Sequence, residues 1–212
     1  MRLLVDELAG LDVHSVALPS TGDNPATLGD MYADAEVIAA AAAAIDGPVV
    51  VVAHSYGGVP TTQAVGRVPN VRRIIYLAAF QLDAGESVLS VGPPPEEWAN
   101  IHRIDGVAHH TEYKFPLEGF YGDVDPSLAQ QAIAQLGFHS FAAPQQTLTE
   151  VAWKTIPSTY IICDGDRAIA PSAQEGFAKR ANRIHRMNTS HSPFLSQPAS
   201  LAQLIRQEVE AA

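Results

Sequence analysis

The fold is decided by one stretch of the chain, Val49-Val50-Val51-Val52-Ala53-His54-Ser55-Tyr56-Gly57-Gly58. A continuous β-branched run of this kind predicts a strand that is buried on both faces, as in a parallel sheet covered by helices. The helical pattern over residues 58–67 follows with no room for a long loop. The stretch therefore predicts a buried strand that turns directly into a helix.

The rest of the chain repeats this alternation of strand and helix. Short apolar, β-rich runs that predict further strands occupy residues 13–18, 71–79, 159–163 and, more weakly and nearer a sheet edge, 182–187. Helical patterns occupy residues 28–46, 172–181 and 199–211. Such alternation predicts an α/β protein with a doubly wound, mostly parallel sheet. Residues 81–154 carry no strong buried-strand signal, and we expect them to form a mostly helical insertion.

Composition narrows the classes of partner. The chain has 212 residues, 47% of them hydrophobic and 17% charged, with a formal net charge of −10. The acidic balance and the lack of a basic run argue against nucleic-acid and anionic-membrane partners. A single cysteine, Cys163, excludes an internal disulfide framework. No apolar run is long enough for a membrane helix, and the acidic start does not resemble a signal peptide. We expect a cytoplasmic protein without a metal or cofactor.

Ser55 lies where a nucleophile elbow would place it. In such an elbow the serine stands on a strained strand-to-helix turn, and its hydroxyl projects above the sheet. We expect the residues two before and two after it, Ala53 and Gly57, to be small because the turn brings their Cβ positions together. The alternative interpretation is an ordinary turn with a capping serine.

A serine nucleophile needs a base and an acid that orients the base. On this architecture they follow the serine in the order acid, then histidine. Asp164 and Asp166 both lie just past the strand at residues 159–163, and His191 lies just past the next strand. We favour Asp166 because it sits deeper in the loop, whereas Asp164 stands directly at the strand end.

These segments together resemble the α/β-hydrolase superfamily, and more narrowly the small esterases related to plant methylesterases and hydroxynitrile lyases. The resemblance is carried by residues 18–22, 53–58, 76–80, 163–169 and 191–198. It implies a Ser55–Asp166–His191 triad and an oxyanion-hole donor from the backbone N–H of Tyr56. It also implies a helical cap over residues 82–153 on a core formed by residues 1–81 and 154–212.

The chain departs from this family at its start. Members begin with a strand bearing a His-Gly motif, whose loop supplies the other oxyanion-hole N–H, and no such segment is present. That strand lies between the strand expected at residues 13–18 and the elbow strand. Three explanations stay open. The functional protein is longer; a rearranged or partner-completed sheet fills the gap; or the chain is a weakly active or inactive homologue.

The resemblance implies a serine hydrolase that cleaves carboxylic esters of small, largely apolar substrates through an acyl-enzyme. Trp98, Phe120 and Tyr121 are candidate pocket-lining residues, although packing within the cap explains them equally well. One rival is a hydroxynitrile lyase, which in that family uses a lysine directly after the histidine, where this chain has Ser192. The other is a truncated homologue that binds without turnover. The expected partner is a small-molecule ester, and a homodimer is one assembly open to the chain.

Overall fold

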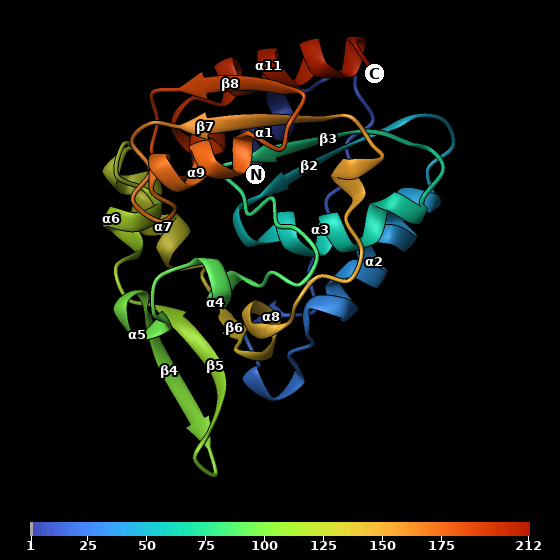
Figure 1. Ribbon diagram of the computed structural model, residues 1–212. Coiled ribbons are helices and arrows are strands. Elements are labelled where there is room, and N and C mark those ends of the chain that lie inside the picture. The colour runs from blue at the N-terminus through green and yellow to red at the C-terminus, as the bar shows by residue number, and fades with distance from the viewer. Residues whose placement is uncertain (1) are drawn as a thin grey trace.

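A computed structural model describes residues 2–212 (Figure 1). Its main sheet has four parallel strands in the order β2-β3-β7-β8. Their bounds are β2 Val49–His54, β3 Val71–Leu77, β7 Ser158–Cys163 and β8 Arg183–Met187. The strand at β8 is largely exposed and lies at one edge, as its weaker apolar pattern predicts. The prediction of an α/β, mostly parallel sheet is confirmed.

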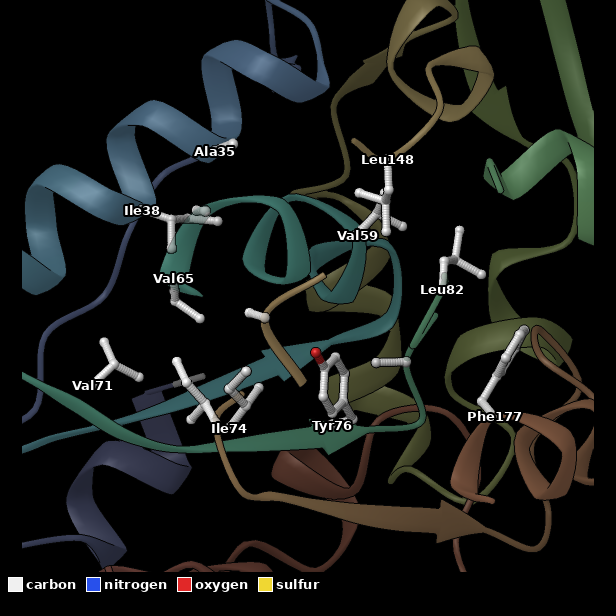
Figure 2. Close-up of a cluster of buried hydrophobic side chains, with 14 of the residues drawn as sticks. Ala35, Ile38, Val59, Val65, Val71, Ile74, Tyr76, Leu82, Leu148 and Phe177 are labelled. Atoms are coloured by element: carbon white, nitrogen blue, oxygen red, sulfur yellow. The ribbon is translucent and has the colours of Figure 1, made fainter. Parts of the chain in front are cut away.

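Helices cover both faces of this sheet. On one face, α1 (Arg2–Glu7) and α11 (Pro198–Glu210) pack a cluster that includes Leu4 and Ile205. The other face carries α2 (Met31–Ala43), α3 (Gly58–Ala64) and α9 (Pro171–Ala178). Figure 2 shows Ile74 and Tyr76 of β3 pointing into this second cluster, towards Ile38 and Val65. The two central strands, β3 and β7, are therefore buried between two helical layers, as their apolar sequences predict.

Local sequence explains where α2 begins. Asp30 is its N-cap, and the Asp30 side chain accepts a hydrogen bond from the backbone N–H of Ala33. The run that follows consists of alanine, the residue type with the highest helix propensity. Asp34, in the first turn, is fully buried and is used in the site described below.

Residues 82–153 contain β-structure as well as short helices, so the expectation of a mostly helical insertion is only partly correct. Strands β4 (Ala99–Ile104), β5 (Val107–Tyr113) and β6 (Phe138–Ser140) pair antiparallel, and β6 also pairs with β1 (Thr21–Gly22). The β4–β5 hairpin projects away from the parallel sheet (Figure 1). The helices of this region are α4 Val88–Val91, α5 Pro95–Trp98, α6 Pro116–Phe120, α7 Pro126–Ile133 and α8 Ala142–Gln145. The chain also forms α10 Pro193–Ser196 and the 3-10 helices η1 Pro25–Thr27, η2 Ser55–Gly57, η3 Val65–Arg67 and η4 Ala152–Lys154.

The strand predicted at residues 13–18 is not formed. This segment has no regular secondary structure, and Val13 and Val16 are exposed. Strand preference depends on a neighbouring strand and on burial. Within residues 2–212, β2 pairs with β3 alone, so the parallel sheet ends at the elbow strand. None of the described helices is long and apolar enough to cross a membrane.

Candidate active site

Ser55 stands at the end of β2 in a strained conformation. Its φ angle is +55°, and it is one of few described non-glycine residues with positive φ. Non-glycine residues rarely occupy this region, and the strain is held by surrounding structure. Ser55 opens η2, which leads directly into α3, and its backbone oxygen accepts a hydrogen bond from Phe80 N at 3.1 Å. The local geometry is that expected of a nucleophile elbow.

The tight contact that requires a small residue after Ser55 lies at Gly58, and not at Gly57 as we expected. A Cβ built on Gly57 would meet nothing within 4 Å, whereas one on Gly58 would lie 2.5 Å from the Phe80 carbonyl oxygen. The same Cβ would lie 3.1 Å from that of Ala79. The close approach is therefore between α3 and the chain that leaves β3, not across the elbow turn itself. Ala53 is buried, in agreement with a small residue there.

Asp166 and His191 lie in contact. His191 Nδ1 is 2.7 Å from Asp166 Oδ2, and both side chains are almost completely buried. Both residues follow carboxyl ends of neighbouring strands, β7 and β8, where sheets of this kind bind their ligands. The other ring nitrogen, His191 Nε2, is buried and has no hydrogen-bond partner among the described residues. It is the nitrogen available to a nucleophile.

Three donors hold the Asp166 carboxylate in place. Its Oδ1 accepts hydrogen bonds from the backbone N–H groups of Ala168 and Ile169, at 2.7 and 3.0 Å. Its Oδ2 accepts from Gln174 Nε2 at 2.8 Å. Asp164, the other candidate acid, is exposed and pairs with Arg186. The structure therefore brings Asp166, and not Asp164, to the histidine.

Gln174 and His54 are site residues that sequence reasoning missed. Gln174 on α9 is fully buried, donates to both Asp166 and the Ile169 carbonyl, and accepts from Cys163 N. No pattern in the sequence distinguishes it from other helix glutamines. His54 directly precedes Ser55.

His54 connects the elbow to the loop that carries His191. Its Nε2 lies 2.8 Å from the His191 carbonyl oxygen, which can only accept, so Nε2 carries the proton. The two rings lie 4.5 Å apart between centroids. Burial lowers the pKa of His54 well below its usual range, with the nearby His191 as a further cause. His54 is therefore neutral, so it does not repel a positive charge on the neighbouring His191 ring.

Ser55 borders a cavity of about 880 Å³ between the core and residues 82–153. Its wall is mainly apolar, and its aromatic side chains include Phe80, Trp98, Tyr113, Phe115, Phe120 and Phe138. Of the proposed lining residues, Trp98 and Phe120 belong to this wall. Tyr121 does not; it packs with Val124 and Ala129 in a separate cluster, because α6 ends at Phe120 and the chain turns away. Glu97, Glu118 and Arg167 bring charge to an otherwise mainly apolar surface.

Tyr56 is anchored through its side chain. Its hydroxyl donates to Asp34 Oδ2 at 2.7 Å, while Asp34 Oδ1 accepts from Ser20 N at 2.8 Å. Burial raises the pKa of Asp34, against the effect of these hydrogen bonds. The Tyr56 ring also lies 4.6 Å from that of His139, whose pKa burial lowers to about 4. Tyr56 is thus fixed to α2 and faces a neutral histidine on the cavity wall.

The histidines of the β4–β5 hairpin do not form a metal centre with other residues. His109 and His110 lie next to each other, with their Nδ1 atoms 3.1 Å apart. Among residues 2–212, no group of three or more His, Cys, Asp or Glu side chains is placed to hold a metal ion.

With this geometry in place, comparison with known proteins identifies the class. The model of the alpha/beta hydrolase family matches residues 1–204, and the chain belongs to this family. It is 32% identical over 211 residues to "Probable hydrolase R7" of Phoma sp., covering 92% of this chain and 86% of that protein. It is 31% identical over 172 residues to "Alpha/beta hydrolase nvfD" of Aspergillus novofumigatus, covering 74% of this chain and 68% of that protein.

Solved structures share the fold at lower identity. A methylesterase from Arabidopsis superposes with a TM-score of 0.84 at 19% identity, covering 100% of this chain and 93% of that one. A pyrethroid hydrolase from Sphingobium faniae JZ-2 gives 0.80 at 21% identity, covering 99% and 91%. Polyneuridine aldehyde esterase gives 0.80 at 19% identity, covering 97% and 91%. The suspected relation to plant methylesterases is confirmed at the level of fold.

Proposed function

We propose that this alpha/beta hydrolase is a serine esterase that cleaves carboxylic esters through an acyl-enzyme. Ser55 is the nucleophile, His191 the general base and Asp166 the acid that orients it. One observation carries the proposal: the 2.7 Å contact between Asp166 and His191, in a loop that His54 ties to the strained elbow. A strained serine at a cavity, together with a base and an acid that orients the base, are the parts that acyl transfer requires.

In the first half-reaction, Ser55 Oγ attacks the ester carbonyl carbon as His191 Nε2 takes its proton. The imidazolium that forms is stabilised by the Asp166 carboxylate at Nδ1. The carbonyl oxygen becomes an oxyanion, and the backbone N–H of Tyr56, at the start of η2, donates to it. His191 then returns the proton to the alcohol as the carbon–oxygen bond breaks, which leaves an ester on Ser55.

The second half-reaction repeats these roles with water. His191 Nε2 removes a proton from a water molecule, and the resulting hydroxide attacks the acyl-enzyme carbonyl carbon. The tetrahedral intermediate collapses as the proton passes to Ser55 Oγ, which releases a carboxylic acid and restores the serine. Neutral His54, 4.5 Å from the His191 ring, adds no charge that would oppose the imidazolium in either step.

The cavity supports a largely apolar substrate. Its aromatic wall matches apolar acyl or alcohol groups, and about 880 Å³ lies toward the upper end of ordinary ligand pockets. The names of the structural relatives, a methylesterase and a pyrethroid hydrolase, are consistent with esters as a substrate class. We propose uncharged small-molecule esters, with residues 82–153 acting as the cap that supplies most of the aromatic wall.

Labelling with a fluorophosphonate probe tests this proposal. We expect the wild-type protein to be labelled, Ser55→Ala to lose labelling and ester hydrolysis, and the exposed-serine control Ser172→Ala to retain both. A panel of uncharged p-nitrophenyl esters of increasing acyl length then measures the substrate range. Absence of labelling would support a protein that binds without turnover, and cyanide release from mandelonitrile without ester hydrolysis would support a lyase. Either result contradicts the proposed esterase.

A further inference from the structure

The loop that carries His191 is fastened to the region proposed as the cap. Ser190, directly before His191, is almost completely buried. Its hydroxyl donates to Asp123 Oδ1 and lies 3.3 Å from a second acceptor, the carbonyl oxygen of Phe120. Phe120 is the last residue of α6 and Asp123 lies in the turn between α6 and α7, about seventy residues earlier in the chain. One buried hydroxyl thus connects the histidine loop to this turn.

The same turn places an aromatic ring against the histidine. The Phe120 ring stacks on His191, with 5.4 Å between centroids and 29° between planes. Phe120 also contacts Tyr113 of β5, with 4.1 Å between the ring centroids. Phe120 also forms part of the cavity wall. His191 is therefore enclosed by Asp166 at one edge, His54 on the elbow side and Phe120 on the cap side.

We propose that Asp123 and Ser190, the cap latch, are positioning residues for the base. This inference rests on the proposed function, since it assigns the latch a role in the same reaction. The latch holds the segment that joins α6 to α7 against the histidine loop, and hence seats the Phe120 ring on His191. A seated ring holds the imidazole in one orientation, with Nδ1 on Asp166 and Nε2 unpaired. Without the latch, the turn and its ring can move away while the Asp166–His191 hydrogen bond persists.

Rate depends steeply on such placement, because a displacement of about 1 Å in a catalytic group can cost on the order of 100-fold. The latch is the polar connection that the structure shows between Ser190 and the α6–α7 turn, and the stacking contact depends on where that turn lies. We therefore expect removal of either latch partner to lower kcat by about 10-fold or more. KM should change less, because most of the cavity wall stays in place.

Alanine variants of the latch and a matched control test this inference. The variants are Ser190→Ala, Asp123→Ala, the double variant and the conservative Asp123→Asn, which keeps an acceptor oxygen. Asp125→Ala is the control, because Asp125 lies in the same turn but caps α7 through the N–H groups of Ser127 and Leu128. We expect each latch variant to lower kcat, the double variant to lose no more than either single one, and Asp123→Asn to recover most of the rate.

A spectroscopic measurement tests the latch independently of the proposed esterase activity. The ring current of Phe120 shifts the ring-proton signals of His191, which can be followed by NMR on histidine-labelled protein and assigned with His191→Asn. We expect these signals to move in Ser190→Ala and Asp123→Ala but not in Asp125→Ala. Unmoved signals would overturn the latch even in an active esterase, and so would additive losses in the double variant. Moved signals in a protein without esterase activity would overturn the proposed function and leave the seating of Phe120 established.

Discussion

Replacing Gly57 or Gly58 by alanine tests where the steric constraint near Ser55 lies. The structure places it at Gly58, whereas the sequence motif places it at Gly57. Gly57 and Gly58 both have helical backbone angles, so alanine adds only a methyl group at either position. At Gly58 that methyl carbon would lie 2.5 Å from the Phe80 carbonyl oxygen, a backbone atom that cannot rotate away. At Gly57 it would meet nothing within 4 Å.

The magnitudes follow from these contacts. Forcing an extra methyl into a filled site costs about 1–3 kcal/mol, and the better helix propensity of alanine returns at most about 1 kcal/mol. We expect Gly58→Ala to lower the free energy of unfolding by roughly 1–2 kcal/mol, or about 2–8 °C in Tm for a chain of this size. Gly57→Ala should instead be neutral or stabilising by up to about 1 kcal/mol, because it restricts the unfolded chain.

Thermal and urea unfolding followed by circular dichroism measures both effects, and the fluorophosphonate reaction rate reports on the elbow. Gly58→Ala should also slow labelling, since Phe80 N donates to Ser55 O and the Phe80 carbonyl must move. The reasoning would be refuted if Gly57→Ala destabilised the protein as much as Gly58→Ala. That outcome would locate the tight contact across the elbow turn, where the motif alone places it.

Three further predictions follow from buried polar groups. Gln174→Leu removes hydrogen bonds to Asp166 and two backbone groups and should cost about 2–4 kcal/mol in urea unfolding, against at most about 0.5 kcal/mol for the exposed control Gln203→Leu. Burial lowers the pKa of His139 to about 4, so the unfolded chain binds a proton there that the folded protein excludes. Stability should therefore fall as pH drops from about 6.5 to 4, and His139→Phe should remove roughly 2–3 kcal/mol of that fall; an unchanged pH profile would contradict it. Burial raises the pKa of Cys163 to about 12, so Ellman's reagent at pH 8 should react only after denaturation, and rapid reaction of the native protein would count against the buried thiol.

The main sheet could be predicted because each of its strands has a local signal. β2, β3 and β7 each contain a run of apolar residues rich in Val or Ile, which is the pattern of strands in a sheet covered by helices. The segment at residues 13–18 has a similar composition and yet forms no strand. Its composition allows a strand, but pairing requires a neighbour, and the described sheet ends at β2. Composition alone cannot supply that information.

The β4–β5 hairpin was missed although the sequence carries a signal for it. Its strands are exposed on much of both faces, so they lack the alternation that marks a half-buried strand. The turn between them, Asp105-Gly106, is a typical two-residue hairpin turn, and both residues have positive φ, at +50° and +79°. Giving that dipeptide more weight than hydrophobic periodicity would have predicted the hairpin.

The order of Ser55, Asp166 and His191 along the chain was sufficient to nominate them, because each follows a strand end and strand ends converge in a parallel sheet. The contacts that support these three residues could not be predicted from the sequence. Gln174 meets Asp166 across a loop, and Ser190 meets Asp123 from a distant part of the chain. Such contacts depend on side-chain placement in three dimensions, which no spacing rule encodes.

The position of β2 explains why these side-chain contacts matter. Within residues 2–212 the strand that leads to Ser55 has a neighbour on one side only, so its ladder with β3 cannot by itself fix the elbow. Three further bonds reach the elbow from elsewhere: Phe80 N to Ser55 O at 3.1 Å, His54 Nε2 to His191 O at 2.8 Å, and Tyr56 Oη to Asp34 Oδ2 at 2.7 Å. They come from the chain after β3, the loop after β8 and helix α2. A strained residue such as Ser55 persists only where its surroundings over-determine it, and here those surroundings are side chains and loops more than the sheet. Changes at His54, Asp34 or Phe80 should therefore alter the reactivity of Ser55 more than changes of similar size elsewhere along β2.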